Sequence, residues 1–184
     1  PDPYEFSLLG ANTNYKKKLS TSENEYTITS LEASAYAHIF GLSVEYDKRG
    51  DENENDLTGL FNLRLLGSSI QSSALTIHYG QRTRTFSGLD PMSVTRNQFY
   101  QISLQIYLGR YFGFNGHHRT YLPFTDSYFG EITGTQVQAG VFLEFEFLRI
   151  FGTYFKDTQK NSNPTTPPPE IPREGLKTGL QFFF

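Results

Sequence analysis

Gly175-Leu176-Lys177-Thr178-Gly179-Leu180-Gln181-Phe182-Phe183-Phe184 is the stretch of this sequence that decides the fold class. Successive side chains of a β-strand point to opposite sides, so the stretch has two different faces. One face carries Leu176, Thr178, Leu180, Phe182 and Phe184, and the other carries Lys177, Gly179, Gln181 and Phe183. An apolar face toward lipid and a polar face toward a lumen is the pattern of a transmembrane β-barrel strand.

The same stretch resembles the C-terminal strand of Gram-negative outer-membrane β-barrel proteins, in which a terminal Phe follows alternating apolar residues. The resemblance implies that Leu180, Phe182 and Phe184 form the signal read by the outer-membrane assembly machinery. It also implies that the protein resides in the bacterial outer membrane. The resemblance is to the general class of small barrels and singles out no family within it.

Composition agrees with a barrel and excludes some alternatives. The chain has 184 residues, no cysteine and a formal net charge of −3. This length fits one domain spanning residues 1–184, and the charge does not favour a nucleic-acid partner. Aromatic residues reach 16% although all hydrophobic residues together reach only 37%. Because the chain has 17 Phe, 12 Tyr and no Trp, we expect Phe and Tyr to form the aromatic girdles at the two membrane interfaces.

The alternating pattern recurs along the chain and predicts an all-β, antiparallel transmembrane barrel of ten strands. The predicted strands are residues 4–13, 25–36, 41–48, 57–66, 73–86, 98–107, 110–119, 132–146, 150–158 and 175–184. Within 150–158, we assign Phe151 and Phe155 to the lipid and Tyr154 and Lys156 to the interior. An eight-stranded barrel is the alternative. Apolar residues stay on the same face throughout residues 98–114, so this stretch could form a single strand.

The predicted connections alternate between short and long. Short connections fall near residues 37–40, 67–72, 108–109 and 147–149, and long polar ones at 14–24, 49–56, 87–97, 120–131 and 159–173. Outer-membrane barrels have short periplasmic turns and longer extracellular loops, so an even number of strands places both termini at the periplasmic side. The proline-rich residues 163–172 are expected outside the strand interiors because proline has no N–H to donate.

The polar faces of the predicted strands carry charges that would meet in a narrow lumen. The predicted lumen network consists of Glu32, Arg64, His78, Arg82, Glu144, Glu146 and Lys177. Buried charges must be paired or hydrated, so we expect the carboxylates of this set to pair with its cations. Such a network would largely plug the lumen, and a thin water-filled channel is the alternative.

Other polar groups suggest contacts at the outer surface. Lys16, Lys17 and Lys18 form a basic run that could contact lipopolysaccharide phosphates. His117 and His118 are adjacent, so on a strand they point to opposite faces and cannot easily bind one metal ion, whereas in a loop they could. No metal and no cofactor is predicted.

The most consistent function is a non-enzymatic one, namely a structural or surface-interaction barrel that contacts the lipid bilayer and lipopolysaccharide. A narrow pore for small solutes is the alternative. A hydrolase at the extracellular rim is the second alternative, with candidate residues His118, Asp90, Asp126 and Ser127 near the predicted loops. A monomer is expected because a closed barrel leaves no edge strand in need of a partner.

Overall fold

The computed structural model describes residues 4–19, 22–50, 53–68, 72–86, 93–126, 130–162 and 170–184. These residues form ten strands, and the predicted strand number is confirmed. The strands are β1 (Tyr4–Leu19), β2 (Ser22–Ala37), β3 (Phe40–Arg49), β4 (Glu54–Leu66), β5 (Ala74–Phe86), β6 (Ser93–Tyr107), β7 (Phe112–Asp126), β8 (Gly130–Phe145), β9 (Leu148–Asn161) and β10 (Glu170–Phe183). Nowhere in these ranges is there a helix that is long and apolar enough to cross a membrane.

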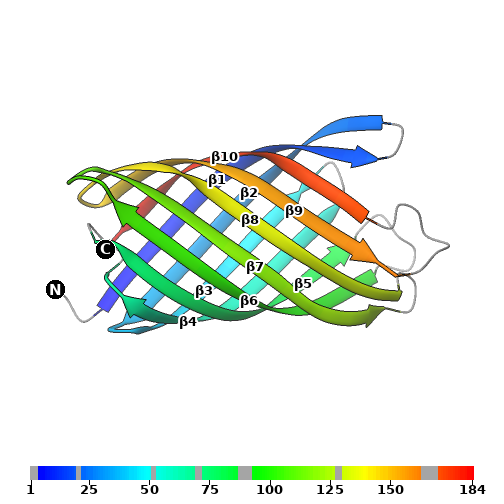
Figure 1. Ribbon diagram of the computed structural model, residues 1–184, viewed down its shortest axis with the longest axis horizontal. Coiled ribbons are helices and arrows are strands. Elements are labelled where there is room, and N and C mark those ends of the chain that lie inside the picture. Colours follow the sequence, from blue (N-terminus) through cyan, green and yellow to red (C-terminus); the bar gives the residue numbers. More distant parts are fainter. Residues whose placement is uncertain are drawn as a thin grey trace.

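Each strand pairs with its sequence neighbours, and β1 pairs with β10 to close an antiparallel barrel (Figure 1). The closing register runs from Ser7 opposite Phe183 to Lys17 opposite Arg173. At the end of this seam the Phe184 N–H donates to the Phe6 carbonyl at 2.9 Å. The eight-stranded alternative is therefore wrong, because β6 and β7 are separate strands that pair with each other.

Both termini lie at one end of the barrel (Figure 1), which we call the turn end, and the opposite end is the loop end. Connections at the turn end are tight: β2 and β3 are joined by residues 38–39, and β8 and β9 by residues 146–147. His38 and Glu146 adopt positive φ angles of 54° and 52° there. The predicted placement of the short turns beside the termini is confirmed.

The outer surface carries an apolar belt that starts at the turn end. On β6, for example, Ile106, Leu104, Ile102 and Tyr100 point outward and are 40% to 55% exposed. Exposed apolar side chains arranged in this way on a closed barrel need lipid around them. The protein is a transmembrane β-barrel of the outer-membrane type, and it contacts the lipid bilayer.

Tyrosines mark the edge of the belt toward the loop end. They are Tyr46, Tyr79, Tyr100 and Tyr154, and each is 39% to 53% exposed on the outer face. Two residues further toward the loop end, each tyrosine is followed on the same face by an exposed polar residue, namely Lys48, Gln81, Gln98 and Lys156. This is the arrangement of an interfacial girdle, and we call these four residues the tyrosine girdle.

The strands continue well beyond this girdle, so the long loops predicted from the sequence are mostly strand. β1 runs for eight residues from Asn12, the first polar residue of its outer face, to Leu19. At a tilt of about 40° a strand gains roughly 2.5 Å of height per residue, so this part of the wall rises about 20 Å above the belt. Its outer face is polar because it meets water, and the apolar alternation that reveals a lipid-facing strand disappears there.

Two local predictions were wrong. In β9, Phe151 and Phe155 face the interior with 7% and 3% exposure, and Tyr154 faces lipid with 47% exposure. The parity of β9 was misread because its two phenylalanines were assigned to the lipid, whereas here their rings help to fill the lumen. Of the proline-rich residues 163–172, residues 163–169 lie outside the described ranges, and Pro172 lies inside β10. Pro172 has a register partner on β9 but none on β1, and a proline in a strand is tolerated at such an edge position.

We predict that arginine at the middle of the belt destabilises the folded barrel and that arginine above the girdle does not. Leu104→Arg should lower the free energy of unfolding by about 2–4 kcal/mol, because it places a charge near the bilayer midplane. Gln98→Arg lies on the same face of the same strand and should change it by less than about 1 kcal/mol. Denaturant titration of both variants in lipid vesicles measures the difference, and equal effects would contradict the position of the belt.

Candidate functional site: the polar interior

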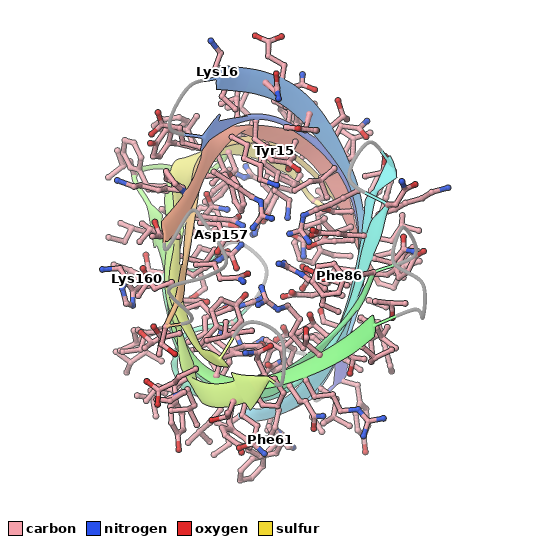
Figure 2. All side chains as sticks on the ribbon, turned by 90° about the vertical axis from the view of Figure 1, so that its right-hand side faces the viewer. Tyr15, Lys16, Phe61, Phe86, Asp157 and Lys160 are labelled. Carbon is pink, nitrogen blue, oxygen red and sulfur yellow. The ribbon has the colours of Figure 1, made fainter. Side chains whose placement is uncertain are left out.

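The interior of the barrel is lined by polar and aromatic side chains that point away from the lipid. Figure 2 looks along the barrel from the loop end, with Phe61 outside the wall and Asp157 inside it. In the described ranges, buried charged side chains come from seven of the ten strands, and among them are Arg49, Arg64, Arg82, Arg84, Arg119, Glu144, Arg149, Asp157 and Arg173. The candidate site is this interior, which has three layers between the turn end and the loop end.

The layer at the turn end is organised by Arg149 of β9. Its Nε donates to Glu144 Oε2 at 2.8 Å, and its Nη2 donates to the same oxygen at 2.5 Å. The guanidinium carbon lies 4.4 Å from the ring centroid of Phe142 and 4.8 Å from that of Phe183. Glu144 is 0% exposed, so the ion pair and the two rings together close this side of the lumen.

A second arginine closes the other side of the same layer. Arg64 donates from Nη1 and Nη2 to the two carboxylate oxygens of Glu5 at 2.9 and 3.0 Å. Its guanidinium carbon also lies 4.0 Å from the ring centroid of Tyr36. This two-bond geometry fixes both side chains, because the planar guanidinium matches the carboxylate.

Inward glycines make room for the rings that fill the interior. A Cβ atom on Gly113 would lie 2.5 Å from Cζ of Phe142, and one on Gly80 would lie 2.6 Å from Cζ of Phe99. Such distances are far below van der Waals contact. The rings therefore lie directly over glycines of neighbouring strands, which is how a narrow barrel accommodates large residues on its inner face.

The middle layer is built around Arg119 of β7. Its Nη2 donates to both carboxylate oxygens of Glu45 at 2.9 Å, and its Nε donates to Gln101 Oε1 at 2.7 Å. His78 bridges Asn62 and Ser103, with ring nitrogens 2.7 Å from Asn62 Oδ1 and 2.8 Å from Ser103 Oγ. Since Asn62 Oδ1 is only an acceptor, Nδ1 of His78 carries the proton and Nε2 accepts from the hydroxyl.

A cavity of about 230 Å³ occupies this middle layer. Its walls carry Glu32, Asp47 and Lys177, and the imidazole of His117 also lines it. A volume of this size holds roughly eight waters at the density of the liquid, and water can hydrate charges that lack a protein partner. The middle layer is therefore a polar chamber with room for water, between two more tightly filled layers.

The layer toward the loop end begins with two apolar clusters on opposite walls. One consists of Tyr15, Ile28 and Phe155, and the other of Leu60, Phe99 and Tyr121. Phe99 and Tyr121 meet edge to face with ring centroids 5.5 Å apart. These side chains narrow the lumen above the chamber.

Beyond these clusters lies a group of buried arginines and carboxylates. Arg84 donates from Nε and Nη2 to the two oxygens of Asp56 at 2.7 and 2.8 Å, and Arg49 Nη1 contacts Asp56 Oδ2 at 2.5 Å. Arg173 lies 3.6 Å from Asp157 and 3.7 Å from Glu54. We call this group the loop-end charge cluster, and its members come from five strands, so it ties distant parts of the wall together.

The predicted lumen residues fall into two groups. Glu32, Arg64, His78, Arg82, Glu144 and Lys177 face the interior. Glu146 does not, and its inclusion was an error, because β8 ends at Phe145 and Glu146 is an exposed residue of the tight β8–β9 turn. The predicted pairings also differ from those found, since Arg64 binds Glu5 and Glu144 binds Arg149.

Sequence reasoning missed most of the arginines that organise the interior, namely Arg49, Arg84, Arg119, Arg149 and Arg173. Arg49 and Arg173 were assigned to loops because the outer face around them is polar. Arg84 shares the parity of His78 and Arg82 on β5, so the alternation alone could have identified it. Arg149 was placed in the predicted connection 147–149, whereas the turn is residues 146–147 and β9 already begins at Leu148.

The remaining candidates lie elsewhere. Lys16 is exposed on the outer face near the loop end (Figure 2), 3.8 Å from Glu25, and the Lys17 ammonium lies 5.9 Å from the Tyr26 ring. Lys18 lies in β1, and its side chain is outside the described part. Leu180, Phe182 and Phe184 are exposed on the lipid side, as predicted for their face.

Two of the four rim residues proposed for a hydrolase lie in the described ranges, and these two are far apart. His118 and Asp126 lie on the same strand, β7, eight residues apart, which corresponds to roughly 26 Å. His118 points outward beside the apolar belt, whereas Asp90 and Ser127 lie outside the described residues. Within the described ranges, no group of three or more His, Asp or Glu side chains is arranged to hold a metal ion.

Comparisons with known proteins give structural neighbours only. Neither protein-family models nor curated protein sequences match this chain. Among solved structures, it is similar to Neisserial surface protein A, with 12% identity, a TM-score of 0.41 and 97% of each chain covered. It is similar to Ail, the attachment invasion locus protein of Yersinia pestis, with 10% identity, a TM-score of 0.36 and full coverage of both chains. The outer membrane protease OmpT of Escherichia coli shares 12% identity with a TM-score of 0.37, over 100% of this chain and 97% of that one.

We predict that Arg149→Met destabilises the barrel by about 3–5 kcal/mol, because it leaves the fully buried Glu144 carboxylate without its cation. The double variant Arg149→Met, Glu144→Gln should recover much of this loss, since methionine still packs against the two rings and the amide is neutral. Chemical unfolding of both variants in the same detergent measures the effect. Equal destabilisation of the single and double variants would contradict a structural role for the ion pair.

Proposed function

We propose that this protein is a non-conducting, non-enzymatic outer-membrane barrel that presents a rigid protruding wall to molecules at the cell surface. The observation that carries the proposal is the filling of the lumen on both sides of the chamber. At the turn end the filling consists of the Arg149 and Arg64 ion pairs with their aromatic partners. Toward the loop end it consists of two apolar clusters followed by the loop-end charge cluster.

These fillings favour a plugged lumen for energetic reasons. Side chains held by two-bond ion pairs and stacked on rings do not swing aside without exposing a buried charge. A solute would have to break at least one such pair at each end of the chamber. The same interactions stiffen the wall above the membrane, where no lipid supports it, and a stiff wall suits a surface that binds other molecules.

The outer face just above the tyrosine girdle supports contact with lipopolysaccharide. Exposed cations at this height include Lys16, Lys48, Arg96 and Lys156. They are positioned next to the region where lipid phosphates lie, and attraction between phosphates and nearby lysine or arginine is general at membrane surfaces. The proposal assigns these contacts an anchoring role for a barrel that acts as a monomer.

A narrow pore for small solutes is the second candidate, and the polar chamber of about 230 Å³ favours it. Its walls carry Glu32 and Lys177, which make no ion pair with each other among the described residues. Water and small ions could occupy this space. A pore would require the fillings on both sides of the chamber to open. An experiment that detects such opening therefore distinguishes the pore from the plugged barrel.

Conductance distinguishes the two candidates. Purified protein in a planar bilayer should show no stable open events over the voltage range at which a general porin in the same membrane conducts. The physical reason is that ions cannot pass two fillings that are held by buried ion pairs. Reproducible, stable open events from the purified chain would favour the pore and end the plugged proposal.

We also propose that the assembly machinery reads the lipid-facing residues Leu180, Phe182 and Phe184. Phe184→Ser should reduce the amount of folded protein in cell outer membranes severalfold, and refolding of the purified variant into detergent should remain close to normal. Phe184 is 71% exposed, so little packing is lost with its ring. Heat-modifiable gel migration reports folded protein in both settings, and a matching loss in detergent would contradict a role in recognition.

A further inference from the structure

The wall of the barrel is not paired along its whole height between β6 and β7. The last register pair joins Phe99 with Tyr121. Beyond it, Ser93–Gln98 of β6 pair only with β5, and Phe124, Thr125 and Asp126 of β7 have register partners only on β8. Among the described residues, no backbone hydrogen bond joins these two ends. We call this opening the β6–β7 seam.

A bulge next to a proline explains why the two strands part. The β7–β8 register shifts between Tyr121 and Phe124, and Pro123 lies within this irregularity. A bulge bends its strand, and proline supplies no N–H for a ladder. β7 therefore follows β8 away from β6, and the β6 end keeps an unpaired edge.

The seam lies above the membrane. Its base is beside Tyr100 of the tyrosine girdle, and the outer face of β6 continues from there with Gln98 and Arg96. Open strand edges are not tolerated in lipid but are accessible in water. The six residues from Ser93 to Gln98 span about 20 Å, long enough to pair with an extended segment of similar length.

Two buried donors without acceptors lie behind this edge. Asn97 is 2% exposed, and its Nδ2 has no hydrogen-bond partner. Arg82 is its register partner on β5, is 6% exposed, and likewise has no partner for its Nε. The Arg82 guanidinium carbon lies 4.0 Å from the Tyr121 ring, so this side chain extends beneath the seam to its far side. Buried donors of this kind are costly unless an acceptor reaches them.

We propose that the β6–β7 seam binds an extended acidic peptide segment of a partner protein, which adds to the edge of β6 as a further strand. Main-chain bonds to residues 93–98 would hold the segment, as in other cases of strand addition. An inward-pointing Asp or Glu of the segment would accept hydrogen bonds from Asn97 Nδ2 and Arg82 Nε, and outward-pointing ones would lie beside Arg96. This inference rests on the proposed surface-interaction function and names the class of its partner.

Three synthetic peptides of equal length test the proposal on the full chain in detergent. The first alternates threonine and glutamate, the second alternates threonine and lysine, and the third repeats the first with every second backbone nitrogen methylated. The first should bind at least tenfold more tightly than the other two, because only it offers both the carboxylates and the backbone donors. Fluorescence anisotropy of labelled peptide measures affinity.

Amide hydrogen exchange then locates the bound peptide. The glutamate peptide should slow exchange at Ser93–Gln98 and leave β3 unchanged. Asn97→Leu should weaken its binding about tenfold, since it removes one donor to a carboxylate. Gln98→Leu, on the opposite face of the same strand, is the matched control and should have no effect. Heat-modifiable migration confirms that both variants are folded.

Several results would overturn the proposal. Equal binding of the glutamate and lysine peptides would exclude the acidic preference, and equal binding of the methylated peptide would exclude strand addition. If none of the three peptides binds, or if the bound peptide slows amide exchange only outside β6 and β7, the proposal is also overturned. Because conductance tests the plugged lumen independently, a silent bilayer together with any of these results would end this inference and leave the proposed function intact.

Discussion

The pairing of β1 with β10 is the constraint on which the rest of the structure depends. No water is available inside a membrane to satisfy backbone N–H and C=O groups, so a sheet that crosses it must close on itself. The register from Ser7–Phe183 to Lys17–Arg173 achieves this closure. Once the barrel is closed, each strand must turn one face to lipid and the other to a narrow lumen. Both the apolar belt and the crowded polar interior follow from that division.

The interior shows how charges are accommodated in a lumen too narrow for bulk water. Arg149 and Arg64 are each bound to a carboxylate and stacked on at least one aromatic ring. Aromatic rings stack on the faces of the guanidinium, and a carboxylate accepts hydrogen bonds from its edge. Together these contacts offset the cost of removing a buried arginine from water. The glycines beneath Phe99 and Phe142 provide the space for these rings. The same aromatic rings therefore fill the space inside the barrel and stack on its buried arginines.

Above the tyrosine girdle the wall meets water, so its backbone groups no longer all need a partner on a neighbouring strand. Its outer face becomes polar, and β6 separates from β7 at Pro123. The lumen at this height is filled by the loop-end charge cluster, which links five strands and supports the wall without lipid. Sequence patterns could not reveal this region as strand, because Asn12–Leu19 of β1 lack an apolar face to alternate with a polar one. Arg49 and Arg173 were assigned to loops for the same reason, because no apolar face marks their strands at this height.

The sequence by itself determined the class of protein, the position of the short turns and the lipid-facing residues of β10, and it favoured ten strands over eight. Those features depend on local alternation, which each strand carries within its own residues. Only the tertiary structure decided which carboxylate each arginine binds, that Phe151 and Phe155 face inward, and where β6 and β7 part. These depend on the register between strands far apart in the sequence. In a closed barrel that register is set by all ten pairings together, so no single segment contains it.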